Sequence, residues 1–253
     1  MLHYNISGSG KEVLVLLHGF MENSSIWADM EGFLSKDFKL IKVDLPGHGL
    51  SEVKSSPQTM EMMADEVKAT LDSLNLRAVH LLGHSMGGYV SLAFAEKYPE
   101  MLRSLTLFFS TALEDDEEKK KIRTRSIEII DKYFSMFVNN SIPNLFNPNE
   151  KDRLGTKINL AREIAHSTDV EGVKAAQLGM VERPNRLSVL KDLEAKVLII
   201  TGRYDSAVKN ELFISSLPER SNIKVYTLDC GHCGHWEKPE VCSAIINQEL
   251  LNP

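Results

Sequence analysis

The sequence predicts an α/β fold: a mostly parallel central sheet with helices on both faces and a helical cap inserted into it. Over the first 110 residues, short apolar runs, most of them closed by Gly or Pro, alternate with helical patterns. This alternation is typical of a parallel sheet covered by helices. Strand signals are then absent until Lys196. We therefore expect a core of residues 1–110 and 191–253, with residues 111–190 as the cap.

Continuous apolar runs mark the expected strands. A parallel strand is buried on both faces, so its sequence shows no alternation of polar and apolar residues. All of these runs are far too short to cross a bilayer. The expected strands are Val13–Leu17, Lys39–Val43, Ala78–Leu82, Leu105–Phe109, Val197–Thr201 and Ile223–Leu228.

Apolar residues at spacings of three and four mark the helices between these runs. The stretch from Met60 to Leu74 carries one apolar stripe, and Met86–Tyr98 is rich in Ala and Leu and is followed by Pro99. Both patterns predict amphipathic or buried helices. In the expected cap, the apolar residues between Ile129 and Phe137 recur at helical spacing. The charged run that precedes them, Glu114–Arg125, is interpreted as a solvated helix face.

Composition excludes several classes of protein. The chain has 253 residues, 43% of them hydrophobic, and a formal net charge of −6. This supports a sizeable core and gives no electrostatic reason to bind nucleic acid or an anionic membrane. The start of the sequence lacks the basic and apolar segments of a signal peptide, and its three cysteines cannot make a disulfide framework. We therefore expect a cytoplasmic protein with reduced thiols.

The strongest local signal is a serine between two glycines, Gly83-His84-Ser85-Met86-Gly87. It follows an expected strand directly and precedes an expected helix. A serine on such a turn is held in a strained conformation with its hydroxyl exposed, as a nucleophile requires. The helix that starts there also points backbone N–H groups at the same place. Ser85 is therefore the predicted nucleophile.

A nucleophilic serine needs a base, and the base needs an acid that orients it. For this geometry the chain order is serine, acid, histidine. Asp205 follows the strand Val197–Thr201, and His232 follows the apolar segment Ile223–Leu228. Both lie past the carboxyl ends of expected strands, where open α/β sheets build their sites. The alternative interpretation of Asp205 is a helix N-cap.

A cysteine pair in the same segment offers a different chemistry. Cys230-Gly231-His232-Cys233 matches the active-site tetrapeptide of protein disulfide isomerases. Such a pair can exchange disulfides, and two Cys with two His can suggest a zinc site. The pair lies near the end of a long chain rather than at the start of a helix in a small domain. We therefore favour the serine chemistry and expect no metal.

Taken together, the motifs resemble those of the α/β-hydrolase superfamily, in its serine esterase and enol-lactone hydrolase branch, over nearly the whole chain. In that family the His-Gly-Phe turn and the residue after the nucleophile supply the oxyanion-hole N–H groups, which fall on Phe20 and Met86. The matching motifs are Leu17-His18-Gly19-Phe20 with Trp27 downstream, Asp44-Leu45-Pro46-Gly47-His48-Gly49-Leu50-Ser51, Gly83–Gly88, Gly202-Arg203-Tyr204-Asp205, and Gly231-His232 leading to Glu237-Lys238-Pro239-Glu240.

The resemblance also implies roles and competitors for these residues. The cap would follow the sixth strand of the fold. The family register places the base at His232 rather than at His235, which is expected to be a partly buried packing residue. Because some members carry the acid after the earlier strand, Asp115 or Asp116 competes with Asp205. No cofactor is implied.

The implied reaction is hydrolysis of a carboxylic ester, lactone or thioester of a small to medium apolar substrate through an acyl-enzyme. We expect His18, Tyr133, Phe134 and Phe137 to contact that small molecule, since the cap is rich in aromatic residues. The fold also hosts carbon–carbon bond hydrolases and a lyase with the same triad, and sensors that bind a small molecule and signal to a partner. Both remain alternatives because fold and triad do not fix the reaction.

Overall fold

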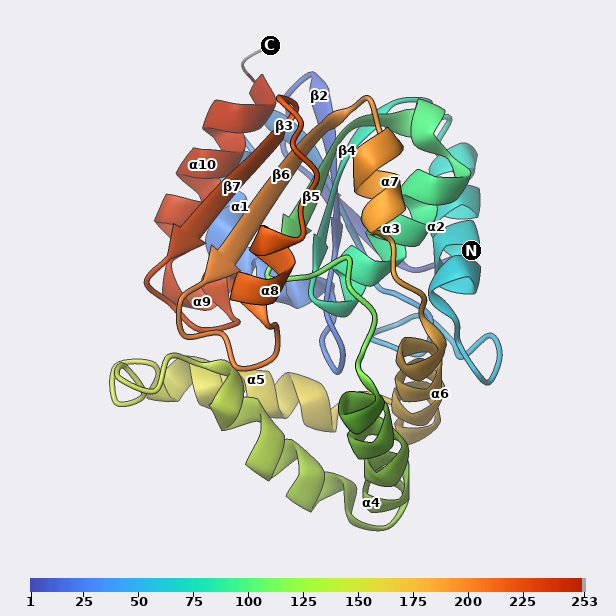
Figure 1. Cartoon of the computed structure of the whole chain (residues 1–253), viewed down its shortest axis with the longest axis vertical. Coiled ribbons are helices and arrows are strands. Elements are labelled where there is room, and N and C mark those ends of the chain that lie inside the picture. Colours follow the sequence, from blue (N-terminus) through green and yellow to red (C-terminus); the bar gives the residue numbers. More distant parts are fainter. Residues whose placement is uncertain (252–253) are drawn as a thin grey trace.

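The computed structural model describes residues 1–251, in which seven strands form one sheet (Figure 1). Their spatial order is β1-β3-β2-β4-β5-β6-β7. β1 is antiparallel to β3, and every other neighbouring pair is parallel. The strands are β1 (Tyr4–Ser7), β2 (Glu12–Leu17), β3 (Phe38–Val43), β4 (Val79–His84), β5 (Leu102–Phe108), β6 (Lys196–Gly202) and β7 (Ile223–Leu228).

All six expected strands are present, and the predicted fold class is confirmed. The sequence analysis missed β1, because Tyr-Asn-Ile-Ser contains no apolar run. This strand lies at the edge of the sheet, where Asn5 and Ile6 are exposed and pair with Lys42 and Ile41 of β3. A central parallel strand is recognisable in the sequence because it is buried on both faces. β1 lies at the edge, so it lacks that burial and the apolar run that goes with it.

Helices cover both faces of the sheet (Figure 1). One apolar core lies between the sheet and α2, α3, α7 and α8, and the other contains residues of α1, α9 and α10. None of the helices in residues 1–251 combines the length and apolar character needed to cross a bilayer. The bounds are α1 (Ala28–Leu34), α2 (Met60–Ser73), α3 (Met86–Lys97), α7 (Leu187–Asp192), α8 (Asn210–Ser215), α9 (Gly234–Glu237) and α10 (Pro239–Leu251), with single turns η1 (Ser24–Trp27) and η2 (Pro99–Met101).

Three further helices, α4 (Glu117–Ser141), α5 (Gly155–His166) and α6 (Val170–Glu182), lie beyond the carboxyl ends of the strands, at the bottom of Figure 1. α4 packs against both α5 and α6 and leads into the short turn η3 (Ile142–Leu145). It is kinked at Tyr133, whose φ and ψ are −142° and 43°. This insertion follows the fifth strand of the chain rather than the sixth, because only five strands precede it.

The division into a core and a cap of residues 111–190 stays a prediction. The position of α7 is relevant to the predicted end of the cap at residue 190. α7 packs against α3, and its residues Val189 and Leu190 belong to the core on that face of the sheet. The helices over the strand ends finish with α6 at Glu182. The chain therefore returns to the sheet several residues before position 190.

Candidate active site

Ser85 sits on the sharp turn between β4 and α3. Its φ of 50° and ψ of −114° are strained for a residue with a side chain. The turn brings the start of α3 against the end of β4, so a Cβ at Gly83 would lie 2.2 Å from the carbonyl oxygen of Gly87. A Cβ at Gly87 would lie 2.5 Å from the carbonyl oxygen of Leu17. The two glycines are thus required by close backbone approach.

Asp205 and His232 meet across the loops that follow β6 and β7. His232 Nδ1 lies 2.8 Å from Asp205 Oδ2, and both side chains are almost completely buried. Because a carboxylate accepts, Nδ1 carries the proton and Nε2 is left free to act as a base. The other carboxylate oxygen, Asp205 Oδ1, accepts the N–H groups of Ala207 at 2.8 Å and Val208 at 3.1 Å. The acid is therefore fixed by its own loop.

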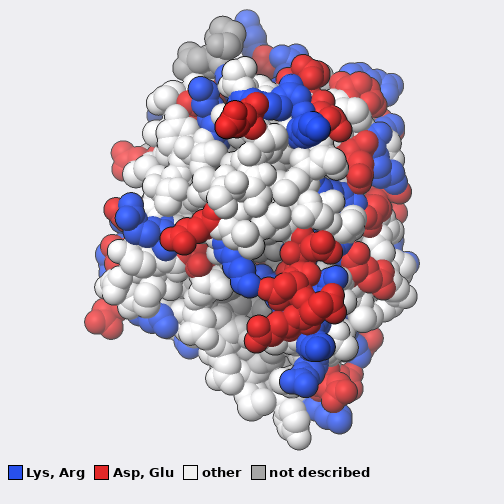
Figure 2. Space-filling view, viewed as in Figure 1, with Lys and Arg blue, Asp and Glu red and all other residues white. Residues whose placement is uncertain are grey.

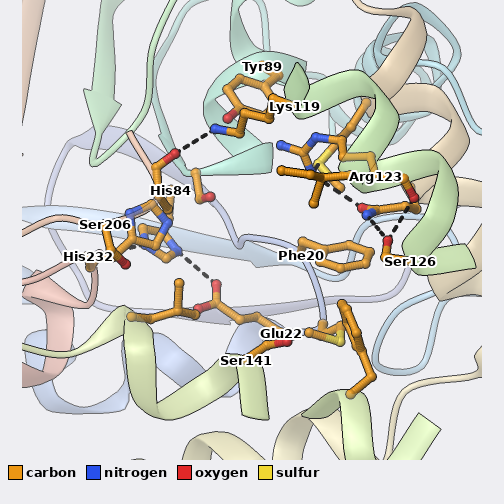
Figure 3. A pocket seen from close by; sticks show the side chains of 18 residues that line it. Phe20, Glu22, His84, Tyr89, Lys119, Arg123, Ser126, Ser141, Ser206 and His232 are labelled. Atoms are coloured by element: carbon orange, nitrogen blue, oxygen red, sulfur yellow. Dashed lines mark hydrogen bonds and ion pairs between the residues drawn. The ribbon is translucent and has the colours of Figure 1, made fainter. Parts of the chain in front are cut away.

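Ser85 and His232 line one cavity of about 280 Å³ between the strand ends and the helices of the insertion (Figure 3). Phe20, on the loop after β2, lines it too. Met86 is fully buried at the first position of α3, where the backbone N–H has no carbonyl of its own helix to bond. A reacting carbonyl beside Ser85 would thus meet a base and backbone donors in one place.

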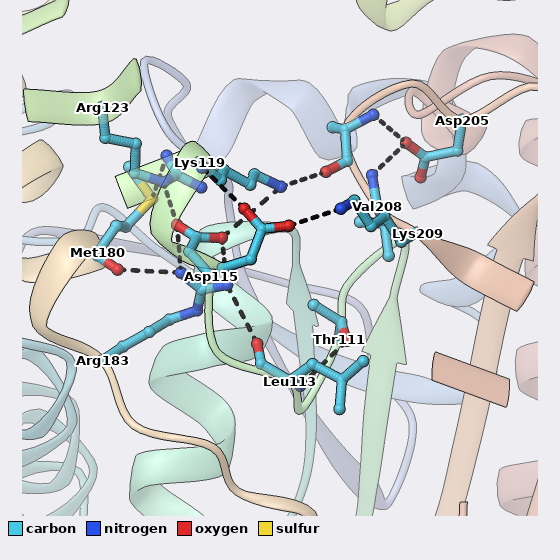
Figure 4. A network of polar contacts seen from close by, with 12 residues as sticks. Thr111, Leu113, Asp115, Lys119, Arg123, Met180, Arg183, Asp205, Val208 and Lys209 are labelled. Atoms are coloured by element: carbon cyan, nitrogen blue, oxygen red, sulfur yellow. Dashed lines mark hydrogen bonds and ion pairs between the residues drawn. The ribbon is translucent and has the colours of Figure 1, made fainter. Parts of the chain in front are cut away.

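The competing acids have other partners. Asp115 is buried against two guanidinium groups: Arg123 Nε lies 2.5 Å from Oδ2, and Arg183 contacts both of its oxygens (Figure 4). Asp116 is exposed, caps the first turn of α4 and pairs with Lys209. Neither carboxylate contacts His232, whereas Asp205 does.

His235, Cys230 and Cys233 are buried in the packing behind the site. His235 is completely inaccessible, neither ring nitrogen has a hydrogen-bond partner, and burial lowers its pKa well below 6.5. It is therefore neutral and cannot reach a substrate. The cysteines are free, and burial raises the pKa of both thiols, which leaves them protonated and unreactive. In the described part of the chain, no cluster of His, Cys, Asp and Glu has the arrangement of a metal site.

Of the four expected substrate contacts, the structure brings only Phe137 to the cavity. His18 is buried behind the loop after β2, where Nδ1 donates to the Gly19 carbonyl and Nε2 accepts from the Leu45 N–H. Tyr133 is 60% exposed at the kink of α4, and Phe134 packs edge-on against His166 at the outside. None of these three residues lines the cavity: His18 is held in the loop after β2, and Tyr133 and Phe134 lie at the kink of α4, on a stretch that faces away from it.

A buried ion pair beside the nucleophile was not predicted. His84 Nε2 lies 3.0 Å from the carbonyl oxygen of His232, and Nδ1 lies 2.8 Å from Glu22 Oε2. Both neighbours are acceptors, so both ring nitrogens donate and the ring is an imidazolium. Burial opposes both charges, but the pair outweighs it: the pKa of His84 is raised, and that of Glu22 is lowered to about 2. The same Glu22 oxygen accepts the Gly19 N–H at 2.6 Å.

The insertion is tied to the loops that carry Asp205 and His232. The N–H of His232 donates to the Leu145 carbonyl at 2.7 Å, and Ser206 Oγ donates to the Asn144 carbonyl at 2.6 Å. The buried carboxylate of Glu237 accepts N–H groups from Gly231 and from Asn147, at 2.9 and 3.2 Å. The segment around η3 thus holds the base and acid loops in place from the side opposite the sheet.

Two cations from the charged run also line the cavity, Lys119 and Arg123. They were expected on a solvated face. Their spacing of four residues is the available signal, because it places both side chains on one side of a helix. That side faces inward here, toward Gln177 and Met180 of α6.

A sequence model of the family described as having the alpha/beta hydrolase fold matches residues 12–239. The chain belongs to the α/β-hydrolase family. A 2-hydroxy-6-oxononadienedioate/2-hydroxy-6-oxononatrienedioate hydrolase of Paraburkholderia phymatum is 29% identical over 99% of this chain and 90% of its own length.

Solved structures agree with this membership. A thermophilic esterase from Thermogutta terrifontis superimposes on this hydrolase with a TM-score of 0.91 at 31% identity, over 99% of this chain and 93% of the esterase. An enol-lactonase from Burkholderia xenovorans LB400 has a TM-score of 0.90 at 22% identity, over 99% and 96%, which shows the shared fold. The resemblance on which the sequence analysis rested is confirmed.

Proposed function

We propose that this hydrolase cleaves a bond next to a carbonyl group by nucleophilic attack of Ser85. The observation that carries the proposal is the Asp205–His232 pair beside a strained serine in one shared cavity. His232 Nε2 takes the hydroxyl proton as Ser85 Oγ bonds to the carbonyl carbon. Asp205 stabilises the imidazolium that forms. The oxyanion is held by the N–H groups of Phe20 and Met86, and loss of one such donor costs about 3 kcal/mol of transition-state stabilisation.

The second half of the reaction returns the enzyme to its starting state. His232 gives its proton to the leaving group as the bond to the carbonyl carbon breaks, which leaves an acyl group on Ser85. Water then attacks that acyl group, His232 takes a proton from the water, and the proton returns to Ser85 Oγ as the acid departs. An oxygen leaving group departs directly by these steps. For a carbon leaving group, the 2-hydroxy diene must first tautomerise to the 2-oxo form, with a proton moving from the enol oxygen to the carbon next to the C6 ketone, so that this carbon departs as an enolate.

For the bond that is cleaved, the curated relatives favour a carbon–carbon bond over the ester expected from the sequence. Their names give 2-hydroxy-6-oxononadienedioate as substrate, a ketone with a carboxylate at each end of its chain. Two cations in the cavity of this hydrolase, Lys119 and Arg123, suit an acidic substrate. Carboxylic ester hydrolysis is the second candidate, and the esterase at 31% identity supports it.

One panel separates the candidates. Wild type, Ser85→Ala, Asp205→Asn and the matched control Asp116→Asn would be assayed with 2-hydroxy-6-oxononadienedioate and with p-nitrophenyl esters of increasing length. We expect Ser85→Ala and Asp205→Asn to lower kcat by about 10³-fold or more on the true substrate, and Asp116→Asn to stay within about threefold. The substrate with the larger wild-type kcat/KM identifies the bond.

Two results would refute parts of this proposal. Activity that survives Ser85→Ala would exclude the nucleophile, and a loss in Asp116→Asn but not in Asp205→Asn would exclude the acid. A single turnover per molecule, in place of steady multiple turnover, would instead support the sensor alternative. Thermal unfolding of each variant would verify that the folded fraction is unchanged.

A further inference from the structure

The cavity of this hydrolase combines apolar surface with one wall that carries cations. Phe20, Ile122 and Phe137 supply apolar surface, and Lys119 and Arg123 of α4 supply positive charge near Tyr89 and Ser126 (Figure 3). In the close view, Arg123 and Ser126 lie across the cavity from His84 and His232, with Phe20 between them. A substrate held at Ser85 would therefore extend along Phe20 toward the guanidinium of Arg123.

The positive charge on this wall exceeds what the protein itself neutralises. Asp115 is the buried carboxylate next to it, and Arg183 already binds both of its oxygens, with Nη2–Oδ1 and Nη1–Oδ2 distances of 2.9 Å. Arg183 is 4% exposed and does not line the cavity. Arg123 and Lys119 are therefore additional to the charge that Asp115 needs (Figure 4).

The remaining charges nearby are paired elsewhere. Glu22 lines the same cavity, but its carboxylate is offset by His84, which must carry two N–H donors to bond both of its acceptors. Figure 2 shows acidic side chains gathered on the outer surface where α4 begins. Among them, Asp116 pairs with Lys209 and Glu114 with Lys120. The outer face of this helix start is thus acidic, while its inner face presents cations to the cavity.

Arg123 also has donors to spare. Its Nε donates to Asp115, and its Nη1 contacts Gln177 Oε1 at 3.3 Å. Its Nη2 group donates to none of residues 1–251. Gln177 in turn donates to Ser126 Oγ at 2.6 Å, which fixes the amide that orients the guanidinium. A planar guanidinium held by Asp115 and Gln177, with a free edge in an enclosed space, is built to bind an anion.

We propose that Arg123, assisted by Lys119, binds a carboxylate of the substrate at the wall of the cavity across from Ser85. The inference rests on the proposed function, since it places the substrate in the cavity of the nucleophile. It goes further by assigning the acidic end of the substrate to two named residues of α4. Lys119 adds charge at longer range, because its ammonium is held 2.7 Å from the Ala207 carbonyl and 3.7 Å from Asp115 Oδ1.

The test compares probes that differ in one charge. Mono-p-nitrophenyl glutarate and p-nitrophenyl valerate carry the difference in the acyl part, and 4-acetoxybenzoate and its methyl ester carry it in the leaving group. The variants are Arg123→Gln, Arg123→Lys and the matched control Lys120→Gln, whose side chain is on the same helix but outside the cavity. Binding of the same probes to Ser85→Ala, measured by calorimetry, gives a readout that needs no turnover.

We expect wild type to prefer the anionic member of at least one pair by about 10-fold or more in kcat/KM. Arg123→Gln should abolish that preference, so that the two members of the pair are treated alike, and Arg123→Lys should retain part of it because the charge remains. Lys120→Gln should change neither. The calorimetric affinities of Ser85→Ala and of Ser85→Ala with Arg123→Gln should show the same pattern.

An anion preference that survives Arg123→Gln would overturn the assignment, and so would equal treatment of both members of both pairs by turnover and by binding. Arg123→Gln could also loosen the insertion, and then both esters would slow together. In that event the binding measurement on folded protein decides, because only a lost preference supports the proposal. Failure of the proposed function looks different: Ser85→Ala would still hydrolyse the neutral esters.

Discussion

Replacing Glu22 by Gln removes the negative partner of a buried ion pair without changing its shape. Glu22 Oε2 accepts two hydrogen bonds, from the Gly19 N–H at 2.6 Å and from His84 Nδ1 at 2.8 Å. His84 in turn donates to the carbonyl of His232. One carboxylate thus links the loop that carries Phe20, through His84, to the loop that carries His232. We expect Glu22→Gln to destabilise the protein in a manner that depends on pH.

The magnitude follows from the carboxyl group itself. Glu22 has a pKa of about 2 in the folded protein against an ordinary value of 4.5. That difference corresponds to about 3 kcal/mol, present above pH 4.5 and lost as the pH falls through the folded value. Glutamine can still accept the Gly19 N–H, and His84 can release its proton, so this figure is an upper bound. We expect Glu22→Gln to lower the free energy of unfolding by about 2 kcal/mol near pH 6.

His84 should also make the free energy of unfolding depend on pH in the alkaline range. The pKa of His84 is raised above 6.5 because Glu22 outweighs the effect of burial. Its stabilisation is therefore complete below 6.5 and is lost as the pH rises through the folded value, where the neutral ring keeps one N–H for two acceptors. Wild type should lose stability in that range. Glu22→Gln should not, so the two curves should converge at alkaline pH.

Urea unfolding followed by circular dichroism, repeated from acid to alkaline pH, measures both effects. The matched control is Glu12→Gln. The Glu12 carboxylate lies 3.4 Å from His80, which is at the opposite end of β4 from His84, and the Glu12 side chain is 34% exposed. That change should cost less than about 1 kcal/mol. Equal losses in the two variants, or an unaltered alkaline decline in Glu22→Gln, would show that the buried pair is not the stabilising element described here.

Three other substitutions test the remaining structure. Asp115→Asn should lower the free energy of unfolding by about 3 kcal/mol or more, because it leaves buried guanidinium groups without their carboxylate; a loss below about 1 kcal/mol in urea unfolding would contradict this. Cys230→Ala with Cys233→Ala should leave kcat/KM within about threefold, and iodoacetamide should not inactivate wild type, since both thiols have a raised pKa. In Gly88→Ala the new Cβ would lie 2.3 Å from Ser110 Oγ, so we expect a loss of about 1–3 kcal/mol that Ser110→Gly relieves; no relief would place the strain elsewhere.

The meeting of Ser85, Asp205 and His232 at one edge of the sheet could be predicted because each of these residues follows a strand. Ser85 follows β4 directly, and Asp205 and His232 lie three and four residues past the ends of β6 and β7. The carboxyl ends of parallel strands meet at one edge of the sheet. The place of these residues after strands in the sequence was therefore enough to predict that they lie close together in the fold. The same logic failed for β1, which lies at the sheet edge and has no buried run.

The cavity wall could not be predicted in the same way. Which face of α4 turns inward depends on its kink at Tyr133 and on packing against α6, and neither leaves a signal in one sequence. A run of charges was therefore interpreted as solvated, although Arg123 is mostly buried. Glu22 was overlooked for a related reason: a single acidic residue in a loop gives no hint that its partner, His84, lies sixty-two positions away.

The hydrogen bonds that join Asn144, Leu145 and Asn147 to Ser206, His232 and Glu237 have a consequence for engineering. Chimeric hydrolases are naturally designed by exchanging the whole insertion for that of a relative with another specificity. In this chain such an exchange would also remove the backbone partners of the His232 N–H, the Ser206 hydroxyl and the Glu237 carboxylate, which lie in or beside the loops of His232 and Asp205. A graft that keeps residues 144–147 and replaces only the flanking helices should preserve turnover while changing which molecules are accepted.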